Sequence, residues 1–332
     1  MLTASDYRPP RWLRNRHLQT VLGGAAIRGR RGAAHLAATA GHTRELLLDG
    51  GDGVRLLALH SVPATGEPHG LVVLLHGWEG SADSTYMRLA AARLLEDGYE
   101  VVRLNFRDHG QTHHLNEGLF HSNLIDEVVQ AVADLALKQR TGPLAVGGYS
   151  LGGNFALRLA LRAPAAGLAL SRVAVVCPVL DPARTMEAME RGFPAYLRHF
   201  EDRWRASLRR KRELYPQLHD FGDDVLALRM RPLTQWLVER NTDFGTVERY
   251  FDGYSIAGER LAALQVPASI LMAADDPVIP VEDFRRARLA DGTRLEISPW
   301  GGHCGFIEDA ALNGFGERWL AERLSRPARH RG

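Results

Sequence analysis

The sequence predicts an α/β protein in which a mostly parallel central sheet is covered by helices on both faces. Short apolar runs alternate with helical patterns along most of the chain, as is typical of strand and helix units in a parallel sheet. The runs are continuously apolar, which is expected for strands that are buried on both faces. With 332 residues, of which 45% are hydrophobic, the chain is long enough to bury a large core.

A hairpin is the first regular element that the pattern predicts, after an irregular start. The apolar runs 45–48 and 54–59 flank Asp49-Gly50-Gly51-Asp52-Gly53, a turn signal between two antiparallel edge strands. The alternation that follows predicts strands at 71–75, 101–106, 144–147 and 173–176, and helices at 85–96, 124–139 and 151–161. It resumes near the C-terminus with strands at 268–272 and 294–297, a helix at 282–289 and a last helix that ends near residue 324.

The alternation stops between Pro182 and Ala263, where the chain is aromatic, charged and helical in pattern. We interpret 182–263 as a helical cap that is inserted into an α/β core formed by 1–181 and 264–332. One helical face of this segment carries an apolar stripe, and arginines 203, 205, 209 and 210 lie elsewhere; the stripe consists of Leu197, Phe200, Trp204 and Leu208. Packing of the stripe on the core is the simpler interpretation, and peripheral contact with a membrane surface is the alternative.

Charge and cysteine content argue against several classes of protein. Lys and Arg number 41 against 39 Asp and Glu, and a net charge of +2 predicts no nucleic-acid partner. Cys177 and Cys304 are too few for a disulfide framework. We find neither an apolar signal segment nor a run of about 18 apolar residues, so we expect a cytoplasmic protein. Nothing in the sequence specifies an oligomeric state.

The motif Gly148-Tyr149-Ser150-Leu151-Gly152 lies between an apolar run and a helical pattern. Serine is a weak nucleophile, and a sharp strand-to-helix turn exposes it and places it beside a base. Glycines at both ends of the motif allow the strand and helix backbones to approach closely. We therefore predict Ser150 as a nucleophile and the backbone N–H of Leu151, at a helix N-terminus, as an oxyanion donor.

A serine nucleophile needs a histidine base and an acid that orients it, and both candidates lie downstream. Asp276 follows an apolar strand, and His303 lies in a glycine-rich loop that we expect to be exposed. Asp275 and Asp181 are alternative acids, because each also follows a predicted strand. The order Ser150, Asp276, His303 is the one expected of an α/β-hydrolase.

The segment His76-Gly77-Trp78-Glu79-Gly80 follows the strand at 71–75. This is the position from which an α/β-hydrolase takes its second oxyanion donor, and we predict that the N–H of Trp78 supplies it. We expect His76 to hold the loop through hydrogen bonds of its ring.

Four further histidines, His109, His113, His114 and His121, follow the predicted strand at 101–106. Imidazole is a common zinc ligand, but these residues lack regular ligand spacing and cysteine partners. We favour contact with substrate over a metal site, and we expect no metal or other cofactor.

Several short motifs, in order along nearly the whole chain, carry a family resemblance. They are Arg14-Asn15-Arg16-His17-Leu18-Gln19-Thr20, His76-Gly77-Trp78-Glu79-Gly80-Ser81, Asn105-Phe106-Arg107, His121-Ser122, Gly148-Tyr149-Ser150-Leu151-Gly152-Gly153-Asn154, Asp275-Asp276-Pro277 and Gly301-Gly302-His303-Cys304-Gly305-Phe306. With them the chain resembles the YheT-like branch of the α/β-hydrolases, which is related to the abhydrolase-domain lipases. It departs from that pattern at Asp108-His109, where a glycine and a small residue commonly follow Phe-Arg.

The resemblance implies a serine hydrolase that acts on carboxylic or lipid-like esters and needs no cofactor. We therefore expect a small-molecule acyl ester, lipid-like or of short or medium chain length, as the substrate. The same triad would also serve a thioesterase, an amidase or an acyltransferase. A binding protein that keeps the fold without the chemistry is a further alternative.

Overall fold

The computed structural model describes residues 1–138 and 142–325 and contains an eight-stranded sheet in the order β1-β2-β4-β3-β5-β6-β7-β8. The strands are β1 (Ala40–Asp49), β2 (Arg55–Pro63), β3 (Leu71–Leu75), β4 (Glu100–Leu104), β5 (Leu144–Tyr149), β6 (Leu170–Val176), β7 (Ala268–Ala273) and β8 (Thr293–Ser298). β2 pairs antiparallel with β1 and with β4, and the other neighbours are parallel. Every residue of β3, β4 and β5 is buried, as the continuous apolar runs predict.

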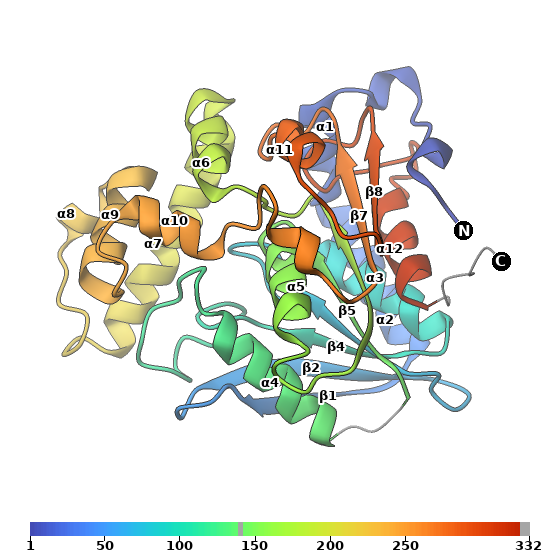
Figure 1. Ribbon diagram of the computed structural model, residues 1–332, viewed down its shortest axis with the longest axis horizontal. Coiled ribbons are helices and arrows are strands. Elements are labelled where there is room, and N and C mark those ends of the chain that lie inside the picture. Colours follow the sequence, from blue (N-terminus) through green and yellow to red (C-terminus); the bar gives the residue numbers. More distant parts are fainter. Residues whose placement is uncertain (139–141, 326–332) are drawn as a thin grey trace.

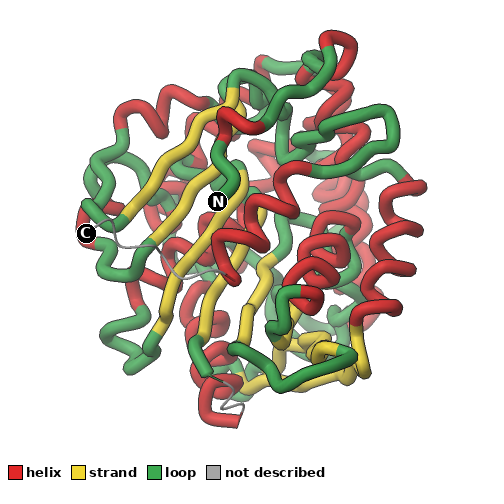
Figure 2. The backbone as a smooth tube through the Cα atoms, turned by 90° about the vertical axis from the view of Figure 1, so that its right-hand side faces the viewer, coloured by secondary structure: helices red, strands yellow, loops and turns green. Residues whose placement is uncertain are grey.

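Helices cover both faces of this twisted sheet (Figures 1 and 2). The helices are α1 (Arg16–Gly23), α2 (Ala26–Thr39), α3 (Thr85–Glu96), α4 (Ile125–Lys138), α5 (Leu151–Arg162), α6 (Pro182–Arg191), α7 (Pro194–Leu214), α8 (Asp223–Leu226), α9 (Met230–Asn241), α10 (Val247–Tyr254), α11 (Val281–Arg286) and α12 (Phe315–Ser325), with short 3-10 turns at Ala4–Asp6, Arg11–Leu13 and Arg260–Ala263. α2, α3 and α12 pack together on one face, and α4 and α5 pack together on the other. This arrangement confirms the predicted α/β class.

The N-terminal region differs from the irregular start that the sequence predicts. α1 and α2 occupy most of it, and β1 begins five residues before the predicted strand. The glycines that weaken the helical pattern of α2 are contact points, because an added Cβ at Gly29 would lie 3.2 Å from Thr85 and one at Gly32 would lie 3.2 Å from Leu89, both on α3. Glycine therefore allows α2 to lie close against α3.

The C-terminal ends of two predicted helices differ from the structure or lie outside its described residues. The helix predicted to end at residue 289 stops at Arg286, because the chain beyond it bonds to a different segment. The N–H of Arg288 donates to the carbonyl of Gly258 over 2.8 Å, and that of Ala290 donates to the carbonyl of Leu261 over 3.3 Å. Gln139, the last residue of the helix predicted at 124–139, lies outside the described residues, as do 326–332 of the predicted core.

α6–α10 form the segment that we interpret as a cap, and α7–α10 lie together on the side away from both termini (Figure 1). The two chain connections to this segment meet at Asn154 of α5, whose fully buried side-chain amide donates to the carbonyls of Val179 and Tyr254 over 2.9 and 2.8 Å. The N–H of Ile256 also donates to the carbonyl of Leu180 over 2.9 Å. The segment therefore leaves and re-enters the core at one place.

The apolar stripe of α7 faces inward. Leu197, Trp204 and Leu208 are buried, and Phe200 stacks on Trp78 of the core with ring centroids 5.4 Å apart. The stripe therefore packs on the core, as in the simpler interpretation, and does not form an exposed apolar face. No helix among the described residues is long and apolar enough to cross a bilayer.

A buried ion pair joins α7 to the loop after β4. Lys211 is fully buried, and its Nζ donates to Asp108 Oδ1 over 2.6 Å and to the carbonyls of His113 and Asn116. Asp108 Oδ2 in turn accepts the N–H of Phe120 over 2.9 Å. The departure from the family pattern at Asp108 thus supplies an anchor for the cap.

Replacing Lys211 by Met is expected to lower the free energy of unfolding by about 3–5 kcal/mol, because Asp108 would remain buried without its cation. Unfolding in urea, followed by circular dichroism, measures this change. The matched control is Arg209→Met on the exposed side of the same helix, which should change stability by less than about 0.5 kcal/mol. Equal stability of the two variants would show that the pair does not anchor α7, and adding Asp108→Asn to Lys211→Met should recover part of the loss.

Candidate active site

Ser150 lies in a sharp turn between β5 and α5. Its φ and ψ of 53° and −120° are unusual for a residue with a side chain, and its N–H donates to the carbonyl of Val176 over 3.0 Å. The flanking glycines permit the crossing, since a Cβ at Gly148 would lie 2.3 Å from the carbonyl oxygen of Gly152, and a Cβ at Gly152 would lie 2.3 Å from that of Leu75. The turn holds the Ser150 side chain at the N-terminus of α5.

Ser150, His303 and Asp276 come together in a hydrogen-bonded series. Nε2 of His303 lies 3.0 Å from Ser150 Oγ, and Nδ1 lies 2.9 Å from Asp276 Oδ2. The other carboxylate oxygen of Asp276 accepts the N–H groups of Val278 and Ile279 over 2.8 and 3.0 Å. The Asp276 side chain is completely buried, so its orientation is fixed on both sides.

Neither alternative acid contacts the histidine ring. Asp275 Oδ1 accepts the N–H of Gly302 over 2.9 Å and so holds the backbone of the His303 loop. Asp181 caps α6, where Oδ1 accepts the N–H of Arg184 over 3.1 Å. The geometry therefore favours Asp276 as the acid that orients His303.

His303 is less exposed than its glycine-rich surroundings suggest, with 11% of its side-chain surface accessible. Burial of the imidazole lowers its pKa, but the Asp276 carboxylate, the adjacent Cys304 sulfur and the hydrogen bond to Asp276 outweigh burial and raise the pKa of His303 to about 9. The site thus favours the protonated form of His303, so the neutral ring that can act as a base becomes the major form only above about pH 9.

The loop of His303 rests on α1, a contact that sequence reasoning did not find. Thr20 Oγ1 accepts the N–H of His303 over 2.9 Å, and the buried side chain of Gln19 bonds to both backbone groups of Ile307. A Cβ at Gly302 would lie 2.4 Å from the carbonyl oxygen of Arg16. The His-Leu-Gln-Thr motif at 17–20 is part of the family resemblance, and it was the signal in the sequence for this contact. The motif alone does not show that Gln19 and Thr20 hold the loop of His303.

The two predicted oxyanion donors border Ser150. Within residues 1–138 and 142–325, the N–H groups of Trp78 and Leu151 have no hydrogen-bond partner. His76 holds the first of these loops, because its Nδ1–H donates to the carbonyl of Gly77 over 2.7 Å and its Nε2 accepts the N–H of Phe106 over 3.2 Å. Burial lowers the pKa of His76 to about 4, so the ring is neutral and acts as a fixed brace.

The loop after β4, which carries the four histidines, mainly contacts the loop of Glu79 and the cap, and only one of its histidines lines the pocket. His109 accepts the N–H of Glu79 over 3.1 Å, His113 bonds to Ser207 of α7, and the backbone carbonyl of His114 accepts the hydroxyl of Tyr215. Only His121 of the four lines the pocket beside Ser150. Burial lowers the pKa of His109, His113 and His121, so these rings are neutral near pH 7. The expected substrate contact is therefore limited to His121.

An apolar pocket lies between the core and the cap and includes Ser150 in its lining. The other lining residues are Trp78, Phe120, His121, Ser122, Leu151, Val179, Pro182, Thr185, Met186, Met189, Phe200, Trp204, Met230, Thr234, Leu237, Tyr250, Phe251, Tyr254, Val278 and Ile279. Methionines from α6 and α9 give the lining an adaptable surface. Such a pocket is suited to a hydrophobic group of a ligand that lies beside Ser150.

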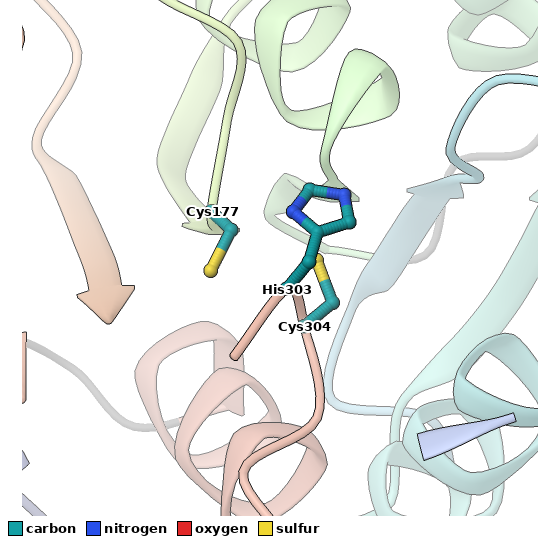
Figure 3. A group of neighbouring side chains, drawn as sticks. All are labelled: Cys177, His303 and Cys304. Atoms are coloured by element: carbon teal, nitrogen blue, oxygen red, sulfur yellow. The ribbon is translucent and has the colours of Figure 1, made fainter. Parts of the chain in front are cut away.

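The four histidines do not gather into a metal site. In the part of the chain that the structure describes, one group of His, Cys, Asp or Glu side chains has the spacing of a metal site, and it consists of Cys177, His303 and Cys304 (Figure 3). This group was not predicted from the sequence, because the two cysteines are far apart along the chain.

The sequence matches one family model and two curated proteins that are named as putative esterases. A family model described as "Serine aminopeptidase, S33" matches residues 66–308. The chain is 27% identical to "Putative esterase slr0264" of Synechocystis, over 83% of this chain and 82% of that protein. It is 25% identical to "Putative esterase YheT" of Escherichia coli, over 97% of this chain and 92% of that protein.

Solved structures share the fold. The esterase Pf2001 of Pyrococcus furiosus aligns with a TM-score of 0.54 at 17% identity, covering 85% of this chain and 87% of its own. An esterase of Pyrobaculum calidifontis aligns with a TM-score of 0.55 at 18% identity, covering 95% of this chain and 96% of its own. Since the family model spans most of the sequence and both curated relatives match along their length, the chain belongs to the α/β-hydrolase family described as "Serine aminopeptidase, S33", in its YheT-like branch.

Proposed function

We propose that the protein is a serine esterase that cleaves carboxylic esters with a hydrophobic acyl group. One observation carries this proposal: Ser150, His303 and Asp276 form a continuous hydrogen-bonded series beside an apolar pocket. The arrangement matches what a nucleophile, a general base and an orienting acid require. The names of the curated relatives, which describe esterases, support the same chemistry.

In the first half of the proposed reaction, Ser150 Oγ attacks the ester carbonyl and His303 Nε2 takes the hydroxyl proton. Asp276 keeps Nδ1 protonated and stabilises the imidazolium ion that results. The tetrahedral intermediate collapses when His303 returns the proton to the leaving alcohol. The acyl group then remains bound to Ser150 as an ester.

The carbonyl oxygen becomes negatively charged during this attack. The unpaired N–H groups of Trp78 and Leu151 are suited to donate to it, and the N-terminus of α5 adds a favourable dipole. Removal of one such donor typically costs about 3–4 kcal/mol of transition-state stabilisation. In the second half, a water molecule loses a proton to His303 and attacks the acyl carbon. His303 then returns the proton to Ser150 Oγ as the bond between the acyl carbon and Ser150 breaks and the acid is released.

The lining of the pocket supports an acyl chain as the group that it holds. Most of the lining is apolar, but the buried hydroxyl of Thr185 and the Nδ1 of His121 have no hydrogen-bond partner among the described residues. Both atoms are closed off from solvent, so the surface that the pocket offers to a substrate is mainly apolar.

Thioesters, amides and transfer to another acceptor involve the same carbonyl chemistry. The proposal of an ester rests on the names of the relatives, which describe esterases, and on the apolar pocket. A binding protein without chemistry would not require a serine, a histidine and a buried carboxylate to be in hydrogen-bond contact.

Replacing Asp276 by Asn is expected to reduce kcat for a p-nitrophenyl ester by about 10⁴-fold, because the amide no longer holds the required tautomer of His303. The neighbouring variant Asp275→Asn is the matched control. Its side-chain oxygen still accepts the N–H of Gly302, so the loss should be at most about tenfold. Comparable activity of the two variants would contradict the assignment of Asp276, and circular dichroism confirms that both are folded.

A series of p-nitrophenyl esters tests the pocket. In the wild type we expect kcat/KM to increase by about fourfold for each added CH₂ that the pocket buries, up to the length that it accommodates. Met189→Trp fills part of the lining and should remove the preference for longer chains while acetyl ester hydrolysis persists. The control Met189→Leu keeps the volume and should keep the preference.

If Met189→Trp and Met189→Leu have the same chain-length profile, the acyl chain does not occupy this pocket. Thioesters and anilides of the same acyl groups belong in the same assay. We expect the ester to be the best substrate, and a higher kcat/KM for a thioester or anilide would replace the proposed reaction class.

A further inference from the structure

The only two cysteines of the chain meet beside His303. Cys177 follows β6, and Cys304 is the residue after His303. One ligand atom from each of Cys177, Cys304 and His303 lies within 4.8 Å of the other two. Figure 3 shows both thiols beside the imidazole, from two separate segments of the chain.

Backbone contacts hold both cysteines in place. Cys177 and Cys304 have positive φ values of 45° and 56°, which residues with side chains seldom adopt. The N–H of Cys177 donates to the carbonyl of Leu271 over 2.8 Å. Cys304 precedes Gly305, where an added Cβ would lie 2.3 Å from the carbonyl oxygen of Gln19. Both thiols are therefore carried by constrained backbone.

The thiols have weak contacts with the rest of the protein. Cys177 Sγ lies 3.9 Å from the carbonyl oxygen of Gly302, and Cys304 Sγ lies 3.6 Å from that of Val176. A thiol is a weak hydrogen-bond donor, so little is lost when either sulfur takes another partner. Cys177 is buried, whereas His303 and Cys304 are partly exposed and offer access to an ion.

We propose that Cys177, Cys304 and His303 form a site for Zn²⁺, and that the bound ion inhibits the enzyme. Two thiolates and one imidazole are a donor set that zinc accepts with a fourth position open to water. Zn–S distances of about 2.3 Å and Zn–N distances of about 2.0 Å place tetrahedral ligands some 3.5–3.8 Å apart, so the observed group, whose ligand atoms lie within 4.8 Å of one another, reaches this spacing by a contraction of at most about 1 Å. Binding releases the two thiol protons to solvent.

Inhibition follows from the hydrogen bonds of His303. Its Nδ1 contacts Asp276 and its Nε2 contacts Ser150. A ring nitrogen that coordinates a metal ion cannot keep its hydrogen bond, because both use the same lone pair or proton position. Whichever nitrogen binds zinc, the series loses either its contact with the nucleophile or its contact with the acid.

Co²⁺ is a spectroscopic probe for zinc sites and tests binding without any activity measurement. We expect the full-length protein, kept reduced with a phosphine, to develop thiolate-to-cobalt charge-transfer absorption that saturates at one equivalent. Zn²⁺ should remove the absorption by displacing cobalt. The double variant Cys177→Ser/Cys304→Ser should give no such absorption, whereas His199→Gln, at an exposed histidine of the cap, should behave as wild type.

Absence of charge-transfer absorption in the wild type, or its persistence in the double cysteine variant, would overturn the site. The reductant prevents a disulfide between the two thiols from producing a false negative. Because this measurement does not involve turnover, it separates failure of the metal site from failure of the proposed esterase activity, on which the inhibition depends.

The inhibitory effect is tested on the proposed ester hydrolysis. Zn²⁺ should inhibit the wild type reversibly, with recovery after addition of EDTA. Cys177→Ser retains activity, because Cys177 neither lines the pocket nor contacts Ser150, and it should require at least about tenfold more Zn²⁺ for the same inhibition. Equal sensitivity of this variant and the wild type would overturn inhibition through this site.

Discussion

The close crossing of β5 and α5 is the constraint on which the rest of the site depends. A side chain at Gly148 or Gly152 would collide with backbone atoms, so the turn exists only because both positions are glycine. This crossing gives Ser150 its positive φ and leaves the N–H of Leu151 without a partner. The proposed nucleophile and one proposed oxyanion donor thus depend on a single backbone geometry.

Segments from distant parts of the chain complete the site around this fixed turn. α1 holds the loop of His303 through Thr20, and the inward face of α7 closes the pocket over Trp78. The buried pair of Lys211 and Asp108 ties α7 to the core in turn. The candidate active site is therefore built from three parts of the chain, which are the turn between β5 and α5, the helix α1 and the helix α7.

Much of this arrangement could be predicted from the sequence because it depends on local patterns. Continuous apolar runs located the strands, and glycine spacing located Ser150. The support of His303 by Thr20 joins residues 283 positions apart, and no local pattern encodes such a contact. The same is true of Cys177 and Cys304, which meet only because of where β6 and the last loop lie. The sequence did not predict α2, because the glycines that allow this helix to pack closely against α3 also weaken its helical pattern.

Covalent labelling shows whether Ser150 is a nucleophile that its surroundings activate. A fluorophosphonate should form one adduct per chain, detected by intact mass spectrometry, and peptide mapping should locate it on Ser150. The adduct should be absent from Ser150→Ala and strongly slowed in His303→Ala. An unlabelled wild type that is folded, or an adduct that persists in Ser150→Ala, would contradict the account.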